Sequence, residues 1–259
     1  MSNVDRTVYR KYGERPHAVA VIHGGPGDMA GELAPIAKEL SAHFGVLEPL
    51  QRQDSLNGQI EELQTTLKQH ADMPVVLIGF SWGAILSCLL TERSPSLIKK
   101  LIVVGCPPLE RGGGARVREQ RQARLSREEW ELFTQSLHDP GDSTHRNAQV
   151  SSLCMKTDSV DPIENAILHG DYHIFNSVWK EVEALRESGE LLSKVQKIKC
   201  PIVAIHGLDD PHPIESVRAC LAPLEQFRLI SLAQCGHRPW IERHAKDLFY
   251  QALVAECRP

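Results

Sequence analysis

The chain has 259 residues, of which 42% are hydrophobic and 24% charged, and its formal net charge is −4. This composition is typical of a globular protein with a full core, and it excludes collagen-like and disordered classes. No apolar stretch approaches the ~20 residues that a membrane-spanning helix needs, and the N-terminus lacks the apolar centre of a secretory signal. We expect a cytoplasmic protein with a small-molecule substrate and no nucleic-acid or membrane partner; the oligomeric state stays open.

The seven cysteines are odd in number and scattered along the chain. They form no Cys-x-x-Cys pair and no Cys/His cluster at the spacing of a zinc site. We therefore expect reduced, mostly buried thiols, no metal site and no cofactor.

Short apolar runs alternate with longer amphipathic segments, which is the pattern of an α/β fold. These runs are continuous rather than alternating, so they predict strands of a mostly parallel sheet that helices cover on both faces. Residues 60–67 carry apolar side chains at i, i+3 and i+7 and predict a helix, with Asn57 as a candidate cap. The predicted strands are residues 18–22, 44–47, 75–78, 101–104, 201–205 and 227–232.

The middle of the chain has a different character, because strand patterns disappear and segments rich in arginine and glutamate replace them. We predict a core of residues 1–106 and 198–259 that is interrupted by a helical cap insertion, residues 107–197. The arginine-rich run at 111–127 favours a solvated helix face, with an anion-attracting mouth of a site as the alternative.

The most informative motif is Gly79-Phe80-Ser81-Trp82-Gly83, which follows the apolar run 75–78 and precedes the buried helix expected at 84–90. Gly-x-Ser-x-Gly between a strand and a helix is typical of a nucleophile elbow, a strained turn that exposes the serine hydroxyl. Ser81 is therefore the candidate nucleophile. The alternative is a Gly-Ser turn without chemistry.

A serine hydroxyl needs a histidine base, and the base needs a carboxylate that fixes its tautomer. In chain order they follow the nucleophile, and both belong in loops after strands. Asp210 follows residues 202–205, with Asp209 in reserve, and His237 lies behind a glycine after residues 227–232. The other histidines, His206 and His212 among them, are interpreted as surface or packing residues.

Backbone N–H groups must also receive the negative oxygen of the reaction intermediate. Trp82, the residue after the nucleophile, is expected to supply one of them. The loop His23-Gly24-Gly25-Pro26-Gly27 is expected to supply the other. A phosphate-binding loop is disfavoured, because no Gly-Lys-Ser/Thr follows these glycines.

These segments agree in type, order and spacing, and from about Val19 to Tyr250 the chain resembles the α/β-hydrolase superfamily. The glycine loop together with the elbow looks most like the proline iminopeptidase branch. The resemblance implies a catalytic triad of Ser81, Asp210 and His237. It also implies a helical cap and an oxyanion hole formed by Gly24 or Gly25 with Trp82.

An iminopeptidase binds a free amino terminus and so needs carboxylates that face the nucleophile. The candidates are Asp158, Asp161, Glu164 and Asp171. However, residues 48–52 lack the Asp-x-Arg-Gly stretch of that branch, which argues against aminopeptidase activity. We further expect four residues to line the substrate pocket: His23, Cys106, Tyr172 and Trp179.

Together these patterns predict a serine hydrolase that cleaves a small ester, thioester or amide through an acyl-enzyme. A proline iminopeptidase-like aminopeptidase is one alternative. A ligand receptor with an inactive site on the same fold is another.

Overall fold

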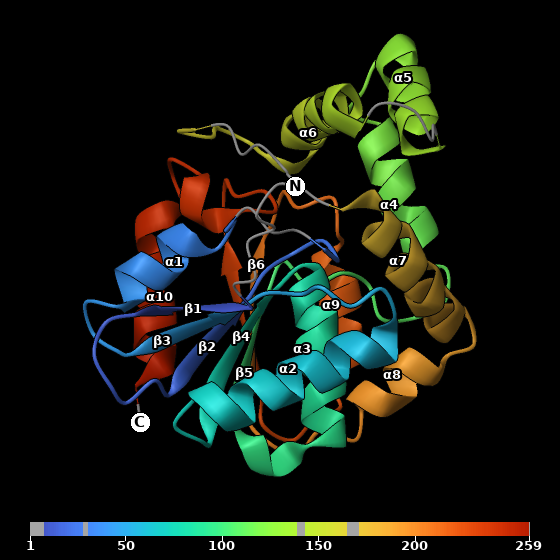
Figure 1. The fold of residues 1–259 in the computed structure, drawn as a ribbon. Helices are drawn as coiled ribbons and strands as arrows, with labels where there is room; N and C mark the ends of the chain where they lie inside the picture. The colour runs from blue at the N-terminus through green and yellow to red at the C-terminus, as the bar shows by residue number, and fades with distance from the viewer. Residues whose placement is uncertain (1–7, 28–30, 139–142, 165–170, 259) are drawn as a thin grey trace, which may run out of the picture.

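The fold is built on a sheet with helices on both faces (Figure 1). The computed structural model describes residues 8–27, 31–138, 143–164 and 171–258. In this part of the chain seven strands follow the order β1-β3-β2-β4-β5-β6-β7, and only β1 runs antiparallel to its neighbour. The strands are β1 (Tyr9–Tyr12), β2 (Val19–Ile22), β3 (Val46–Pro49), β4 (Val75–Phe80), β5 (Ile98–Val104), β6 (Ile202–Gly207) and β7 (Phe227–Leu232).

The mostly parallel sheet predicted from the continuous apolar runs is confirmed. Every residue of β2, β4 and β6 is buried, because side chains on both faces of these strands are covered by helices. The edge strands differ, since each has one neighbour and part of its surface exposed: β1 and β7 are only half-buried.

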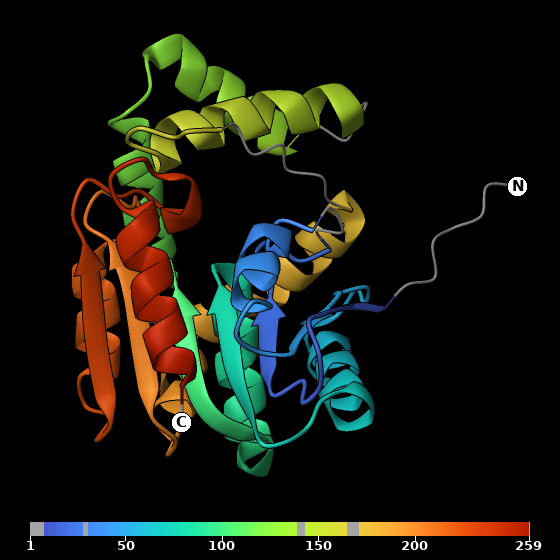
Figure 2. The same ribbon diagram turned by 90° about the vertical axis from the view of Figure 1, so that its left-hand side faces the viewer.

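Helices lie on the two faces of the sheet (Figure 2). An apolar core lies between the sheet and the helices on each face. On one face α1 (Ala34–Leu40) and α10 (Lys246–Cys257) pack over alternate residues of the strands. On the other face the covering helices are α2 (Leu56–His70), α3 (Trp82–Arg93) and α9 (Ile214–Leu221). Two short 3-10 helices, η1 (Pro95–Leu97) and η2 (Pro239–Ile241), complete these layers.

Helix α2 begins earlier than the apolar spacing predicts, and its cap is a different residue. The Ser55 side chain accepts a hydrogen bond from the backbone N–H of Gly58 at 3.2 Å. Asn57 lies inside the first turn and donates to Glu61 instead. The prediction of Asn57 as the cap is therefore wrong, because serine two residues earlier satisfies a free N–H of the first turn.

The chain between β5 and β6 is helical in its described part, and we call residues 107–197 the helical segment. Its helices are α4 (Gly113–Gln122), α5 (Arg127–His138), α6 (Ser143–Asp158), α7 (Tyr172–Glu187) and α8 (Glu190–Val195). In Figure 2, α5 and α6 lie beyond the carboxyl ends of the strands. They pack on each other around Phe133 and Leu153, in a cluster separate from both cores. No described helix combines the length and apolar character that crossing a membrane would demand.

Candidate active site

Ser81 occupies a strained turn between β4 and α3. Its φ of 52° and ψ of −119° place it outside the regions that residues with a side chain normally adopt. A Cβ on Gly79 would lie 2.3 Å from the carbonyl oxygen of Gly83, and a Cβ on Gly83 would lie 2.3 Å from that of Ile22. Both positions therefore require glycine, and the close packing holds the serine at the strand end.

His237 and Asp210 complete a hydrogen-bonded chain that starts at Ser81. His237 Nε2 lies 3.0 Å from Ser81 Oγ, and its Nδ1 lies 2.8 Å from Asp210 Oδ2. Asp210 follows β6 and His237 follows β7, so the parallel sheet delivers all three residues to the same edge. The structure thus brings together the three residues that the sequence singles out.

The neighbouring Asp209 is turned away from His237. Its Oδ2 accepts a hydrogen bond from the backbone N–H of Cys235 at 3.3 Å, and its carbonyl accepts one from Arg124. Asp209 therefore fastens the loop after β6, while Asp210 is the carboxylate that faces His237.

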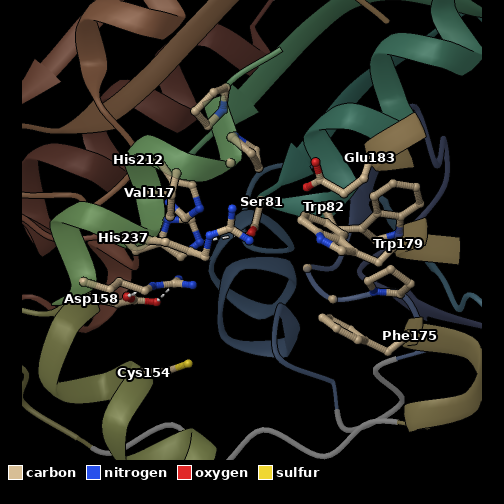
Figure 3. A pocket seen from close by; sticks show the side chains of 18 of the residues that line it. Ser81, Trp82, Val117, Cys154, Asp158, Phe175, Trp179, Glu183, His212 and His237 are labelled. Atoms are coloured by element: carbon tan, nitrogen blue, oxygen red, sulfur yellow. Dashed lines mark hydrogen bonds and ion pairs between the residues drawn. The ribbon is translucent and has the colours of Figure 1, made fainter. Parts of the chain in front are cut away.

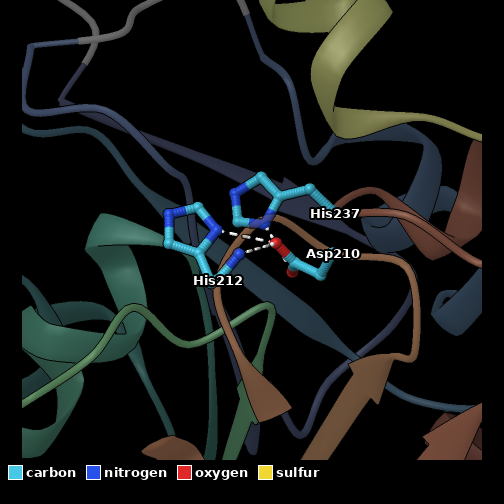
Figure 4. Close-up of side chains that lie close together, drawn as sticks. All are labelled: Asp210, His212 and His237. Atoms are coloured by element: carbon cyan, nitrogen blue, oxygen red, sulfur yellow. Dashed lines mark hydrogen bonds and ion pairs between the residues drawn. The ribbon is translucent and has the colours of Figure 1, made fainter. Parts of the chain in front are cut away.

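A second histidine shares the Asp210 carboxylate (Figure 4). His212 donates to Asp210 Oδ1 from its backbone N–H at 2.8 Å, and its ring Nδ1 lies 2.7 Å from the same oxygen. His206 Nε2 lies 3.5 Å from Asp210 Oδ2. Burial opposes ionisation of Asp210, but the imidazoles of His237, His212 and His206 hold its pKa well below the usual value. His206 and His212 are buried, so the interpretation of His212 as a surface or packing residue misses its place in this site.

Asp210, His212 and His237 also lie close enough together to be considered as metal ligands. The separations of 2.7 and 2.8 Å between imidazole nitrogen and carboxylate oxygen are hydrogen-bond lengths. Two ligands on a tetrahedral zinc ion, each about 2.0 Å from the metal, would be roughly 3.3 Å apart. These contacts therefore form a proton-sharing cluster and give no support for a metal site.

The glycine loop and the start of α3 lie beside the serine. Gly24, Gly25 and Trp82 all line the cavity that contains Ser81. Trp82 is the first residue of α3, so its N–H has no acceptor within the helix and lies at the positive end of the helix dipole. Gly25 has a φ of 53°, a conformation that favours glycine. This arrangement can stabilise an oxygen that becomes negative near Ser81.

His23 lies behind the glycine loop rather than in the cavity. It is 1% exposed; its Nδ1 is 2.8 Å from the Gly24 carbonyl oxygen, and its Nε2 accepts a hydrogen bond from the Gln51 backbone. Burial lowers the pKa of His23, which favours the neutral ring. The expectation that His23 lines the pocket is therefore wrong, because its two ring nitrogens are used to support the loop.

Cys106 also departs from the expectation. It is fully buried in the core, and burial raises its pKa well above the usual value; the cavity is lined instead by the next residues, Pro107 and Pro108. Trp179 does line the cavity. The side chain of Tyr172 lies outside the part of the chain that the structure describes.

The cavity has a volume of about 790 Å³ and places Ser81 between two apolar walls (Figure 3). One wall is aromatic: Phe175 and Trp179 stack with ring centroids 5.8 Å apart, and Trp179 meets Trp82 edge-on at 6.3 Å. The facing wall comes from α4, α5 and α6, and its apolar residues are Val117, Trp130, Phe133, Val150 and Cys154. The charged side chains of Arg118, Arg121 and Asp158 also line the cavity on these helices. A cavity of this size suits a ligand of drug-like dimensions.

Asp158, the last residue of α6, joins the helical segment to the loop that carries His237. Arg121 of α4 donates two hydrogen bonds to Asp158, at 3.0 and 2.9 Å, and Asp158 is 1% exposed. The Asp158 carbonyl oxygen accepts the backbone N–H of His237 at 2.6 Å. Arg238, the next residue, pairs with Glu32 at 3.0 Å beside the glycine loop.

Burial raises the pKa of Asp158, but the charges of Arg121, His237 and Arg238 outweigh this, and the net shift is downward. Asp158 is therefore ionised and paired. The sequence places Arg121 on a solvated face, and it is instead a mostly buried partner of this carboxylate. No motif signals this pair, since its partners are 37 residues apart.

The carboxylates proposed for binding an amino terminus are engaged elsewhere. Asp158 pairs with Arg121, Asp161 pairs with Arg243, and Asp171 caps α7 by accepting two backbone N–H groups. Glu164 is exposed and does not line the cavity. Glu183 does line it, but it pairs with the buried Arg186.

A sequence model described as the alpha/beta hydrolase family matches residues 19–252. A comparison with curated protein sequences gives no match. Among solved structures, an alpha/beta fold family hydrolase from Bacillus anthracis str. Sterne is 15% identical, with a TM-score of 0.74 over 96% of this chain and 94% of that chain.

Two further solved structures share the fold along most of their length. The enol-lactonase from Burkholderia xenovorans LB400 is 18% identical, with a TM-score of 0.65 over 95% of this chain and 94% of that chain. The monoacylglycerol lipase of Paleococcus ferrophilus is 14% identical, with a TM-score of 0.64 over 96% of this chain and 97% of that chain. With the family match across most of its length and the fold described above, the chain belongs to the alpha/beta hydrolase family.

Proposed function

We propose that the protein is a cofactor-independent serine hydrolase that cleaves an ester, thioester or amide. The observation that carries the proposal is the hydrogen-bonded chain from Ser81 through His237 to Asp210, beside a glycine loop and a helix N-terminus. His237 takes the proton of Ser81 as the hydroxyl oxygen attacks the substrate carbonyl. Asp210 accepts a hydrogen bond from the Nδ1–H group of His237, which orients the ring, and its negative charge compensates the charge of the imidazolium.

The negative oxygen of the tetrahedral intermediate is then stabilised by backbone N–H groups of the glycine loop and of Trp82. His237 donates its new proton to the leaving group, and an acyl-enzyme forms on Ser81. Water, deprotonated by the same imidazole, attacks the acyl carbonyl and releases the acid. Apart from water, the steps need only side chains and backbone groups of this chain.

The cavity supports a substrate with apolar parts on both sides of the scissile bond. Aromatic and aliphatic walls flank Ser81, and the helical segment supplies most of them; we propose that it acts as the cap of the site. Structures with the same fold include proteins named as a lipase and an enol-lactonase, and these names favour ester substrates.

A proline iminopeptidase-like activity is the alternative within enzymes. It would need a carboxylate in the cavity that is free to bind an ammonium group. Among the carboxylates that line the cavity, Glu32, Asp158 and Glu183 pair with arginines, while Asp171 and Glu187 accept backbone N–H groups. This engagement favours ester hydrolysis over aminopeptidase activity. Prolyl anilides should therefore be inert when acyl esters are hydrolysed.

Reaction with a fluorophosphonate probe, followed by peptide mass spectrometry, tests the proposal. Only an activated serine reacts quickly, so we expect label on Ser81 and its loss in Ser81→Ala and in His237→Ala. Ser152→Ala, which changes an exposed serine of α6, is the matched control and should label as the unaltered protein does. Folded protein without label would contradict the proposal and favour a receptor with an inactive site.

A further inference from the structure

His212 forms part of the cavity wall next to the proposed base. Its ring centroid lies 4.4 Å from that of His237, and the two rings are inclined by 32°. Both side chains are mostly buried and both line the cavity that contains Ser81. The triad mechanism assigns no role to this second imidazole.

The hydrogen bonds of Asp210 determine the tautomer of His212. An ionised carboxylate can only accept hydrogen bonds, so the Nδ1 atom 2.7 Å from Asp210 Oδ1 must carry the proton. Burial lowers the pKa of His212 to about 4, against the attraction of Asp210, so the ring is neutral near pH 7. Nε2 then carries a lone pair and no proton.

No N–H or O–H group of the described residues donates a hydrogen bond to that lone pair. Asp210 accepts from Nδ1, and the structure gives Nε2 no hydrogen-bond partner among residues 8–27, 31–138, 143–164 and 171–258. Figure 4 shows each imidazole turning one nitrogen toward Asp210 and the other away from it. Because Nδ1 faces the carboxylate, the Nε2 edge is the one that His212 presents to the cavity.

The position of this acceptor relates it to one part of the substrate. His237 Nε2 faces Ser81 and must protonate the departing oxygen or nitrogen, so the leaving group lies against His237. The ring of His212 is the neighbour of His237 on that wall. Two hydrogen-bonding groups on adjacent carbons of a leaving group can therefore reach both imidazoles.

We propose that His212 determines specificity by accepting a hydrogen bond from a hydroxyl or N–H group of the leaving group. The preferred substrates would be esters of an alcohol that has a hydroxyl or N–H group on the carbon next to the one that bears the ester oxygen. Monoesters of a 1,2-diol are an example. This inference rests on the proposed hydrolase function. A leaving group without a donor leaves the buried acceptor unpaired, so we expect discrimination of about tenfold.

Three esters of one acid test the proposal: the 2-hydroxyethyl, 2-methoxyethyl and propyl esters, with the acid chosen so that the propyl ester is hydrolysed. The methoxy compound has the size and oxygen of the first but no donor. We expect kcat/KM in the unaltered enzyme to be about tenfold higher for the 2-hydroxyethyl ester than for the other two.

Two variants separate the roles of the two ring nitrogens. His212→Asn can keep an N–H donor to Asp210 but has no group at the position of Nε2, so the ratio of kcat/KM values should fall to about one. His212→Gln can place an amide oxygen near the position of Nε2, and it should retain part of the preference. His244→Asn changes a half-exposed histidine that does not line the cavity, and its ratio should stay at the original value.

The ratio within each enzyme is the readout, because a merely structural role of His212 would lower turnover of all three esters alike. Equal kcat/KM values for the three esters in an active enzyme would overturn this inference and leave the proposed function intact. Absence of ester hydrolysis together with absence of label on Ser81 would overturn both.

Discussion

Asp158→Asn is the sharpest test of how the helical segment is joined to the loop that carries His237. The substitution keeps the size of the side chain but removes the charge that pairs with Arg121 through hydrogen bonds of 3.0 and 2.9 Å. It also removes the negative charge 3.8 Å from Arg238 Nη1, a buried atom without a hydrogen-bond partner in the described chain. Two guanidinium groups would then lose a buried counter-charge.

The expected cost follows from the burial of the pair. Asp158 is 1% exposed and Arg238 5% exposed, so water cannot replace the missing charge. Removing one partner of a buried pair typically lowers the free energy of unfolding by about 3 to 5 kcal/mol. Because the asparagine oxygen can still accept one hydrogen bond from Arg121, we expect about 3 kcal/mol.

Urea unfolding at neutral pH measures this cost, with Asp161→Asn as the matched control. Asp161 is three residues away and pairs with Arg243 at 3.0 Å, but both side chains of that pair are about half exposed. Exposed pairs contribute roughly 0 to 1 kcal/mol, so this variant should unfold almost as the unaltered protein does. The reasoning would be refuted if the two variants lost the same free energy of unfolding.

Two further predictions concern packing and pH. Gly83→Ala should lower the free energy of unfolding by about 1 to 3 kcal/mol and slow the labelling of Ser81, because its Cβ would meet the Ile22 carbonyl at 2.3 Å. Gly114→Ala is the control in the same urea assay, because its Cβ would meet only the ends of the Glu183 and Arg186 side chains, at 3.3 Å or more. Acidification should cost stability through His212, whose pKa is about 4 when folded and about 6.5 when unfolded. Since the unfolded chain binds the additional proton, stability falls as the pH drops below 6.5, by about 3 kcal/mol at pH 4. His212→Asn should flatten this decline between pH 6.5 and pH 4, and an unchanged slope would contradict it.

The strands could be predicted because their signal is local. A short continuous apolar run bounded by turn residues is typical of a strand in a covered sheet, as in β4 and β6, and β7 has the bounds predicted from its sequence. The elbow could be predicted for the same reason, since the glycines at positions 79 and 83 indicate that backbone segments pass too close together for a Cβ atom. Both inferences need no knowledge of distant residues.

The surroundings of the site could not be predicted in this way. The role of His212 depends on how the loop after β6 turns its ring toward Asp210, and the pairing of Arg121 depends on where α6 ends. The neighbours of His23 in the sequence predict a place in the pocket, whereas in the structure its ring lies behind the glycine loop. Each of these outcomes follows from contacts between segments far apart in the chain, for which the sequence carries no periodic pattern.

The hydrogen bond from His237 to the Asp158 carbonyl bears on how such enzymes can be recombined. A helical segment exchanged for that of a relative would remove the acceptor of the His237 backbone N–H, along with the Asp158 carboxylate that lies 3.8 Å from Arg238. A chimera would therefore have to keep residues 157–158 with the sheet, or import an equivalent carbonyl at the same point. Residues of the helical segment thus line the cavity and also hold the backbone of His237. A chimera designed on cavity shape alone would therefore misplace the imidazole of His237.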